Sequence, residues 1–378
     1  MRFADIIGLS EVKNTLIHSV KSNHVAHAQL FVGKPGSANL AMALAYAQYV
    51  NCENKQEDDA CGECAACNKI QKFIHPDLHF IVPTATTKSI PKRTDAVSQA
   101  FAKEWRAFLA DNPYAYLSEW SAYFGAENKQ CIIPKEESRN IIRTLSMKAF
   151  EAEYKIMLIW LPELMQAPAA NAILKVLEEP PAKTLFLLVS NNTDALLTTI
   201  LSRTQPVQIP LFSDEEVQEY LEQQLNVPPE KALQTAHIVD GNLNEAMKIG
   251  ADVHDENEEY FKQWMRECFK SDFTKLVDWA DRFQRLGKET QKSIFQYGLT
   301  LLRETMLYKF AGEETLRVSG EQKEFIKNFS KVITNQNLEP LVNHFSQSLY
   351  HLERNANPKI TFLNLSLQIV QIFKNWQR

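Results

Sequence analysis

The sequence predicts an α/β fold, a P-loop-type parallel sheet with helices on both faces, followed by a small helical domain and an all-helical C-terminal domain. In residues 1–210, short apolar segments of strand length alternate with segments of helical periodicity. This alternation is typical of parallel strands that are buried on both faces and joined by crossover helices. From Ser213 onward only helical periodicity is found. The 378 residues suffice for two or three domains of ordinary size.

Four near-continuous apolar segments predict the strands: 30–32, 78–82, 156–159 and 185–189. The first two helices are predicted over 11–23, where Val12 and Leu16 share one face, and over the alanine-rich segment 40–50. Because the loops that follow parallel strands gather at one edge of the sheet, we expect the ligand site of this domain there.

Pro206, Pro210 and the segment 212–214 interrupt this pattern, so we expect the α/β domain to end at residue 210. Residues 211–252 are predicted to form a helical lid domain, which begins with a polar cap and an acidic first turn. The C-terminal domain, 253–378, is predicted to contain six helices: 260–269, 273–286, 290–310, 321–333, 338–354 and 360–376.

The composition is that of a soluble protein, and we expect a cytoplasmic location without membrane attachment. No signal peptide is visible, and no apolar stretch approaches the roughly 20 residues that span a bilayer. Lys and Arg total 41 against 46 Asp and Glu, a formal charge of −5. This balance excludes a generally basic nucleic-acid binder, but it leaves room for a local basic patch.

Four of the six cysteines, Cys52, Cys61, Cys64 and Cys67, lie within 16 residues. Cys-x2-Cys spacing lets one tight turn supply two thiolates, and Gly62 permits such a turn. Because no further ligand suggests an open position, the set predicts a closed, structural zinc site with one ion per chain. An iron–sulfur cluster and free thiols are the alternatives.

A glycine-rich turn that contains Gly33 and Gly36 follows the first predicted strand, in the position of a nucleotide-binding P-loop. Ala38, Asn39 and Leu40 replace the second Gly, the Lys and the Ser/Thr of the working motif. Asn39 has no charge for the phosphates, and Leu40 has no hydroxyl for magnesium. We therefore expect no functional ATP site.

The strand 156–159 shows a second defect, because it lacks the Asp-Glu end that holds magnesium and orients water. Glu163 is displaced from that position by two or three residues. Together the two defects predict a chain without intrinsic ATPase activity. An active ATPase with unusual motifs, which uses Lys34 and Glu163, is the alternative.

Residues 84–135 do not fit the alternation and are rich in aromatic and basic side chains. These are Trp105, Phe108, Tyr114, Tyr116, Trp120, Tyr123 and Phe124, with Lys88, Lys92, Arg93 and Arg106 among them. An inserted helical hairpin that packs its aromatics against its own domain is one interpretation. A zinc-dependent nucleic-acid-binding module that stacks its aromatics on single strands is the other.

Two further segments carry specific motifs. Residues 171–181 read Asn-Ala-Ile-Leu-Lys-Val-Leu-Glu-Glu-Pro-Pro, and residues 199–204 read Thr-Ile-Leu-Ser-Arg-Thr. The first resembles the Asn-Ala-Leu-Leu-Lys-x-Leu-Glu-Glu-Pro-Pro signature of clamp-loader AAA+ proteins. The second resembles their Thr-Ile-x-Ser-Arg-Cys box, with Thr204 in place of Cys. The four-cysteine segment also lies where bacterial members of this family carry it.

This resemblance implies a subunit of the DNA polymerase III clamp loader, in which the C-terminal helical domains form a collar. The implied partners are the motor (gamma/tau) and delta subunits, and, through the complex, the sliding clamp and primer–template DNA. Asn244 stands where active relatives carry a nucleotide-sensing Arg, which again implies a non-hydrolysing stator. Arg203 is then expected to be an arginine finger in trans, with Ser202 positioning its turn. By spacing alone, Arg203 is an exposed residue at the end of an element.

Other polar residues near these motifs have simpler interpretations. Lys175, Glu178 and Glu179 either lie at a subunit boundary or form a charged helix end that Pro180 and Pro181 terminate. His27 and His75 are expected to be hydrogen-bonded structural residues, because four cysteines already complete a metal site.

Overall fold

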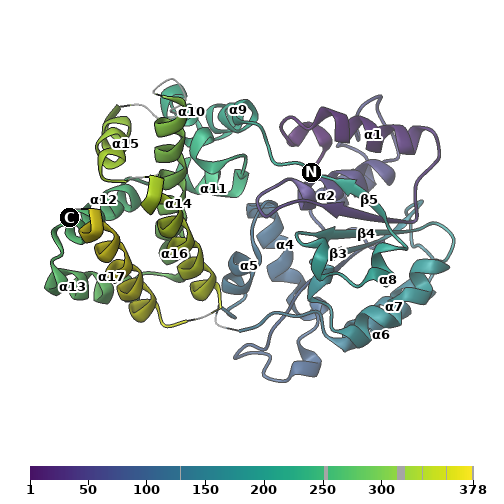
Figure 1. Cartoon of the computed structure of the whole chain (residues 1–378). Coiled ribbons are helices and arrows are strands. Elements are labelled where there is room, and N and C mark those ends of the chain that lie inside the picture. Colours follow the sequence, from purple (N-terminus) through teal and green to yellow (C-terminus); the bar gives the residue numbers. More distant parts are fainter. Residues whose placement is uncertain (128, 251–253, 313–319, 334, 355, 377–378) are drawn as a thin grey trace. The chain divides into compact units, whose positions relative to one another are not determined.

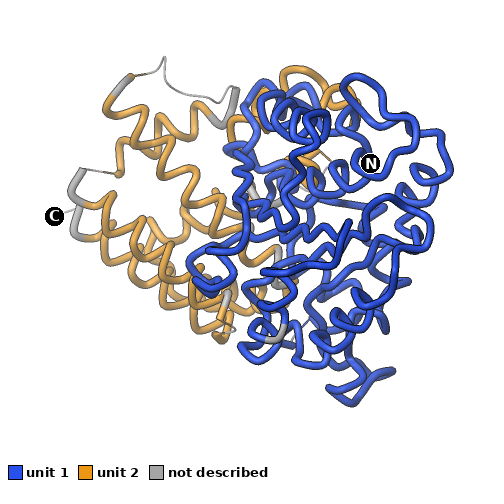
Figure 2. Tube along the Cα trace, turned by 90° about the vertical axis from the view of Figure 1, so that its right-hand side faces the viewer, with its two compact units in different colours: residues 1–220, 240–245 blue, residues 221–239, 246–378 orange. Residues whose placement is uncertain are grey.

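The computed structural model describes residues 1–127, 129–250, 254–312, 320–333, 335–354 and 356–376. The chain forms two compact units (Figure 2). Unit 1 contains residues 1–220 and 240–245, and unit 2 contains residues 221–239 and 246–378. The short segment 240–245 thus belongs to unit 1, although the residues on both sides of it belong to unit 2.

Unit 1 is built on a five-stranded parallel sheet with the strand order β2-β3-β4-β1-β5. The strands are β1 (Ala28–Val32), β2 (Leu78–Ile81), β3 (Lys155–Trp160), β4 (Thr184–Ser190) and β5 (Gln205–Gln208). All residues of β3 and β4 are buried, which explains their continuous apolar sequence. The four predicted strands are confirmed. The sequence did not predict β5, because Pro206 lies inside it; β5 pairs only with β1, at the sheet edge, where a proline is tolerated.

Helices cover both faces of this sheet, so the predicted fold class is confirmed. Figure 1 shows α1 and α2 on one side of the sheet and α6 and α7 on the other. Leu30 of β1 belongs to a core cluster with Ile141 and Ile173 on one face, whereas Phe31 packs against Tyr46 on the opposite face. The helices are α1 (Ser10–Lys21), α2 (Asn39–Val50), α3 (Ala65–Gln71), α6 (Lys135–Ser146), α7 (Ala167–Glu178) and α8 (Thr198–Leu201).

The segment between β2 and β3 contains a helical hairpin, made of α4 (Ala102–Asp111) and α5 (Leu117–Tyr123). Trp105 and Trp120 are 1% and 0% exposed, and their ring centroids lie 5.0 Å apart. Trp105 also packs against Trp160 of β3, at 5.1 Å. Trp120 Nε1 donates a hydrogen bond to the carbonyl of Pro83 at 2.8 Å. Both tryptophans are therefore core residues, as the packing interpretation predicts, and neither ring is exposed for base stacking.

The chain after β5 is helical in the described residues, as predicted. Its helices are α9 (Asp214–Leu225), α10 (Pro229–Val239), α11 (Leu243–Lys248), α12 (His254–Lys270), α13 (Phe273–Arg285), α14 (Lys288–Ala311), α15 (Gly320–Val332), α16 (Asn335–Glu353) and α17 (Pro358–Trp376). Short 3-10 helices span Phe3–Asp5, Arg93–Asp95, Ser98–Phe101, Pro162–Leu164 and Thr193–Ala195. The division into domains at residues 210 and 252 stays a prediction.

An aromatic cluster forms the centre of the core of unit 2. Trp264 and Phe283 lie with their ring centroids each 4.5 Å from that of Phe362, and Phe295 stacks on Phe283 at 5.1 Å. Trp264 Nε1 donates to Ser366 Oγ at 2.9 Å, so the polar atom of the buried indole has a partner. Within the described part of the chain, no helix is long and apolar enough to cross a lipid bilayer.

Candidate functional site

The phosphate-type turn, residues 33–40, lies between β1 and α2 at the carboxyl edge of the sheet. The amide of Gly33 donates to the carbonyl of Ser190, at the end of β4, at 3.2 Å. Gly36 has a φ of +84°, and a Cβ on it would lie 1.9 Å from Asn242 Oδ1. A glycine is thus required at Gly36 for both its backbone conformation and its close approach to Asn242.

Asn39 fills the interior of this turn. The residue is 5% exposed, and its side-chain amide donates to the carbonyl of Ser190 at 3.2 Å and to Asn191 Oδ1 at 2.8 Å. Its own Oδ1 accepts from the amide of Leu40 at 2.8 Å. The Asn39 side chain is therefore a neutral group that is bonded to protein groups at the end of β4.

Glu163 is connected to the hydrogen bonds of Asn39 through Asn191. Glu163 Oε1 accepts from the amide of Asn191 at 3.0 Å, and Asn191 Oδ1 accepts from Asn39. Burial raises the pKa of the Glu163 carboxyl. Its Oε2 is buried and has no hydrogen-bond partner in the described part of the chain. The sequence did not predict a role for Asn191, and its one signal was the pair Asn191-Asn192 directly after a buried strand.

A cavity of about 440 Å³ opens beside the turn, at the carboxyl ends of β1, β4 and β5. Residues 32–34, 191–194 and 208–211 line it. The lining includes two charged residues of opposite sign, Lys34 and Asp194. Lys34, on which the ATPase alternative depends, is thus near Asn191, the partner of Glu163.

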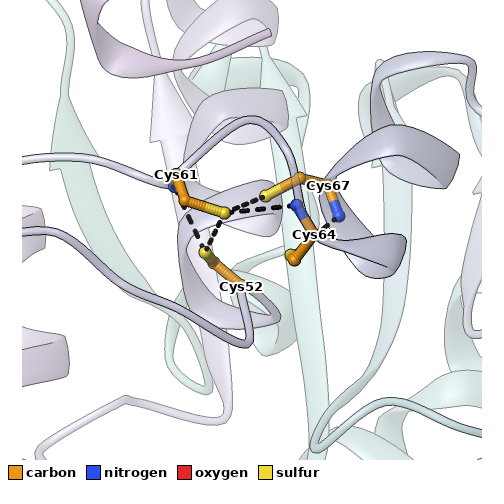
Figure 3. Close-up of side chains that lie close together, drawn as sticks. All are labelled: Cys52, Cys61, Cys64 and Cys67. Atoms are coloured by element: carbon orange, nitrogen blue, oxygen red, sulfur yellow. Dashed lines mark hydrogen bonds between the residues drawn. The ribbon is translucent and has the colours of Figure 1, made fainter.

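The four predicted metal ligands come together in unit 1 (Figure 3). Their sulfur atoms all lie within 4.8 Å of one another. Cys61 Sγ is 3.6 Å from Cys52 Sγ and 3.9 Å from Cys67 Sγ. Four thiolates placed tetrahedrally at 2.3 Å around a zinc ion would be separated by about 3.8 Å. The arrangement therefore fits a four-thiolate metal site.

Backbone amides point at these sulfur atoms. The amides of Glu63 and Cys64 donate to Cys61 Sγ at 3.5 and 3.3 Å, and together they lower the pKa of Cys61 to about 6. Burial instead raises the pKa of Cys52 and of Cys67. A bound divalent cation would stabilise the thiolate form of every ligand. A set of four sulfurs without oxygen or nitrogen ligands is typical of a closed, structural site.

The Ser-Arg pair follows α8, and the guanidinium of Arg203 is held on two sides. Arg203 Nε donates to Glu178 Oε1 at 2.6 Å, and Nη2 forms an ion pair with the same oxygen. Arg203 Nη1 donates to the carbonyl of Thr199 at 2.9 Å and to Ser202 Oγ at 3.1 Å. The Arg203 side chain is 30% exposed. Glu178, which the sequence left between two interpretations, is therefore the acidic partner of Arg203.

The remaining candidate residues lie around the sheet. His27 Nε2 is 2.9 Å from a backbone carbonyl of α7, and the buried ring of His75 accepts from the amide of Asp77 at 3.1 Å. Both histidines are hydrogen-bonded within the domain, as predicted. Lys175 and Glu179 are exposed at the end of α7.

Asn244, which the sequence resemblance predicts to stand in the position of a nucleotide-sensing Arg, is fully buried near the start of α11. Its side chain is bonded to Asn112 and Glu119, which both belong to the inserted hairpin region. The amide of the preceding residue, Leu243, donates to the carbonyl of Gly36 at 3.1 Å. Asn244 therefore lies beside the phosphate-type turn. The sequence carried no signal for its two partners.

Comparison with known proteins yields consistent findings. A family model described as DNA polymerase III, delta subunit, matches residues 8–213. The chain is 26% identical over 238 residues to DNA polymerase III subunit delta' of Bacillus subtilis, covering 63% of this chain and 58% of that protein. It is 29% identical over 188 residues to subunit delta' of Yersinia pestis, covering 49% of this chain and 42% of that protein.

A third relative, DNA polymerase III subunit tau of Bacillus subtilis, is 22% identical over 393 residues, covering 98% of this chain and 62% of that protein. The chain thus spans less than two thirds of the length of each of these relatives. Among solved structures, a DNA polymerase III gamma subunit-related protein from Thermotoga maritima aligns with a TM-score of 0.37. This alignment has 14% identity and covers 97% of this chain and 99% of that chain.

Proposed function

Because the chain belongs to the family described as DNA polymerase III, delta subunit, we propose that it is a non-hydrolysing, delta-prime-type stator of a bacterial clamp loader. It would work in the cytoplasm in a hetero-oligomer with motor (gamma/tau) and delta subunits, and would help load the sliding clamp onto primed DNA. The observation that carries the non-hydrolysing assignment is Asn39. This side chain stands in the position of the phosphate-binding lysine and is bonded to the end of β4 instead.

In this proposal Arg203 acts at the ATP site of a neighbouring motor subunit. A guanidinium suits that role because it is planar, always charged and able to bond two phosphate oxygens. The contacts of Nη1 with Ser202 and with the backbone of Thr199 limit the directions in which the group can point. A phosphate of the neighbour would take the place that the Glu178 carboxylate occupies in the isolated chain. Ser202 and Glu178 are thus positioning residues for Arg203.

The four cysteines are proposed to bind one structural zinc ion. The match between the observed sulfur separations and tetrahedral coordination supports this assignment. Zinc would supply a cross-link between the end of α2 and the start of α3, because Cys52 follows α2 and Cys67 lies in the first turn of α3. Four thiolates leave no open position, so the site has no catalytic part in the proposal.

The test is ATP turnover by the motor subunit from the same source, with primed DNA and clamp present. The additions compared are none, this chain, Arg203→Ala and Arg139→Ala, where Arg139 is an exposed arginine on α6. Arginine fingers contribute about 10³ to 10⁵ to phosphoryl-transfer rates. We expect the wild type and Arg139→Ala to stimulate turnover, and Arg203→Ala to assemble without stimulating. Equal stimulation by both variants would show that Arg203 is not an arginine finger for the motor subunit.

One observation favours the competing function, an active ATPase: Lys34 lines a cavity whose wall also includes Asn191, the partner of Glu163. In that case the isolated chain would hydrolyse ATP with magnesium, and Lys34→Ala would abolish the turnover. We expect no turnover from either form. Burial of Trp105 and Trp120 leaves the nucleic-acid-binding alternative without its two largest stacking residues.

A further inference from the structure

We propose that the inserted hairpin is an internal latch, which docks the segment 240–245 onto the phosphate-type turn without any nucleotide. The term latch refers to three side chains of the hairpin region, Asn112, Tyr116 and Glu119, together with the segment 240–245 to which they are bonded. It deepens the proposed function, on which it rests, because it supplies a physical reason for a stator that needs no nucleotide of its own.

The first part of the latch is the contact of the segment 240–245 with Gly36 of the phosphate-type turn. Asn242 Oδ1 lies so close to Gly36 that a Cβ there would be 1.9 Å from it. The amide of Leu243 donates to the carbonyl of Gly36 at 3.1 Å, and Asn242 Oδ1 also accepts from the amide of Glu245 at 3.2 Å. In a working P-loop, the backbone of such a turn cradles phosphates. In this chain Gly36 contacts Asn242 and Leu243 of the same chain instead.

The second part is the set of bonds from the hairpin region to this segment. Tyr116 Oη donates to Asn242 Oδ1 at 2.9 Å, and Asn242 Nδ2 lies 2.6 Å from the same hydroxyl. Asn112 Nδ2 donates to Asn244 Oδ1 at 2.7 Å, and Asn244 Nδ2 donates to Glu119 Oε2 at 2.8 Å. These partners are 125 to 132 positions apart in the sequence.

Because Asn244 is buried, its hydrogen bonds to the hairpin region fix the position of the segment 240–245. Asn244 is 0% exposed, and both its donor and its acceptor atoms are bonded to the hairpin region. Leaving such a buried amide unpaired is costly, so the segment is held in one register. The same contacts agree with the division of the chain, in which 240–245 belongs to unit 1 whereas its flanking residues belong to unit 2.

The hairpin is a firm support for these contacts because its helices are anchored in the core of unit 1. Trp105 of α4 packs against Trp160 of β3, and Trp120 of α5 is bonded to the backbone of Pro83. Residues 112–119, which carry the three latch side chains, connect and begin these anchored helices. The latch therefore links the turn to the sheet by a second route, independent of α2.

Amide hydrogen exchange of the full chain tests the latch directly, because the amide of Leu243 is bonded to Gly36. The variants are Tyr116→Phe and Asn112→Ala, and the matched control is Tyr123→Phe, which removes the hydroxyl of an exposed tyrosine in the same hairpin. We expect each latch variant to speed exchange of the Leu243 amide roughly fivefold, the effect of one lost hydrogen bond. The control and magnesium-ATP are expected to leave it unchanged.

Unchanged exchange at Leu243 in both latch variants would overturn the proposal, as would protection that appears only with magnesium-ATP. If Asn112→Ala raises exchange throughout β3 and β4 as well, it has lost the fold, and Tyr116→Phe alone decides. The measurement needs no partner subunit. Its failure is therefore distinguishable from failure of the stator assignment, which the motor ATPase experiment tests separately.

Discussion

Replacing Trp105 by alanine should destabilise unit 1, rather than weaken contact with nucleic acid alone. The indole is 1% exposed and touches the rings of Phe80, Phe108, Trp120 and Trp160, with centroid separations of 5.0 to 6.3 Å. Its removal loses the transfer energy of a large buried side chain and leaves a cavity among rigid rings. Substitutions of this kind cost about 3 to 5 kcal/mol.

The variant Trp105→Phe separates the effect of lost side-chain volume from the effect of the buried indole N–H. Trp105 Nε1 is buried and has no hydrogen-bond partner in the described part of the chain. Trp105→Phe keeps an aromatic ring and removes this unpaired donor, whose burial costs about 1 to 3 kcal/mol. We therefore expect Trp105→Phe to cost about 2 kcal/mol less than Trp105→Ala.

The free energy of unfolding would be measured by urea titration of the full chain. Amide hydrogen exchange of β3 and β4 would monitor the unfolding, so that the values refer to unit 1. Binding of a fluorescent single-stranded oligonucleotide at two salt concentrations, for both variants, would complete the experiment. A Trp105→Ala protein with unchanged stability but a lost, salt-dependent affinity for single strands would refute the packing argument. It would support the stacking interpretation of the insertion instead.

Two further predictions concern the metal site and the acid stability. Elemental analysis should find one zinc per chain, and Cys64→Ser should lose the ion and become more sensitive to proteolysis near α3; a variant that keeps metal and fold would contradict the assignment. Burial tends to raise the pKa of Asp77, but three backbone amides, those of Phe150, Glu151 and Ala152, donate to its carboxylate at 2.7 to 2.9 Å and leave the pKa lowered. Its stabilising effect should therefore be complete above the ordinary aspartate pKa and be lost as the pH falls through the lower folded-state value. Asp77→Asn should cost about 1 to 3 kcal/mol at neutral pH and progressively less in acid; a pH-independent difference in unfolding would argue against this.

The phosphate-type turn, residues 33–40, is bonded to other parts of unit 1 through side-chain amides. Asn39 is bonded to the end of β4, and Asn242 lies against Gly36. Asn39 and Asn242 both carry neutral amides that are hydrogen-bonded to protein groups. The turn is therefore a structural joint between β1, β4 and the segment 240–245.

Local chemistry was readable from the sequence. Strands β3 and β4 were predicted because burial on both faces demands a continuous apolar run. The four cysteines were predicted to converge because they lie within 16 residues and Cys-x2-Cys spacing lets one tight turn supply two ligands. That residue 39 is a neutral asparagine and not a lysine needs no structure, since it is read from the residue type alone.

Contacts between distant segments were decided only by the tertiary structure. No periodicity signals that Glu178 pairs with Arg203, that Glu163 reaches Asn39 through Asn191, or that the hairpin holds Asn244. Likewise, a proline obscured β5, whose place at the sheet edge depends on its pairing with β1. The contact of Asn39 with Asn191 depends on the pairing of β1 with β4, which brings the carboxyl ends of these strands together. Composition and spacing describe neighbours along the chain, whereas a hydrogen bond between distant side chains forms only where the packed sheet and its crossovers place both groups.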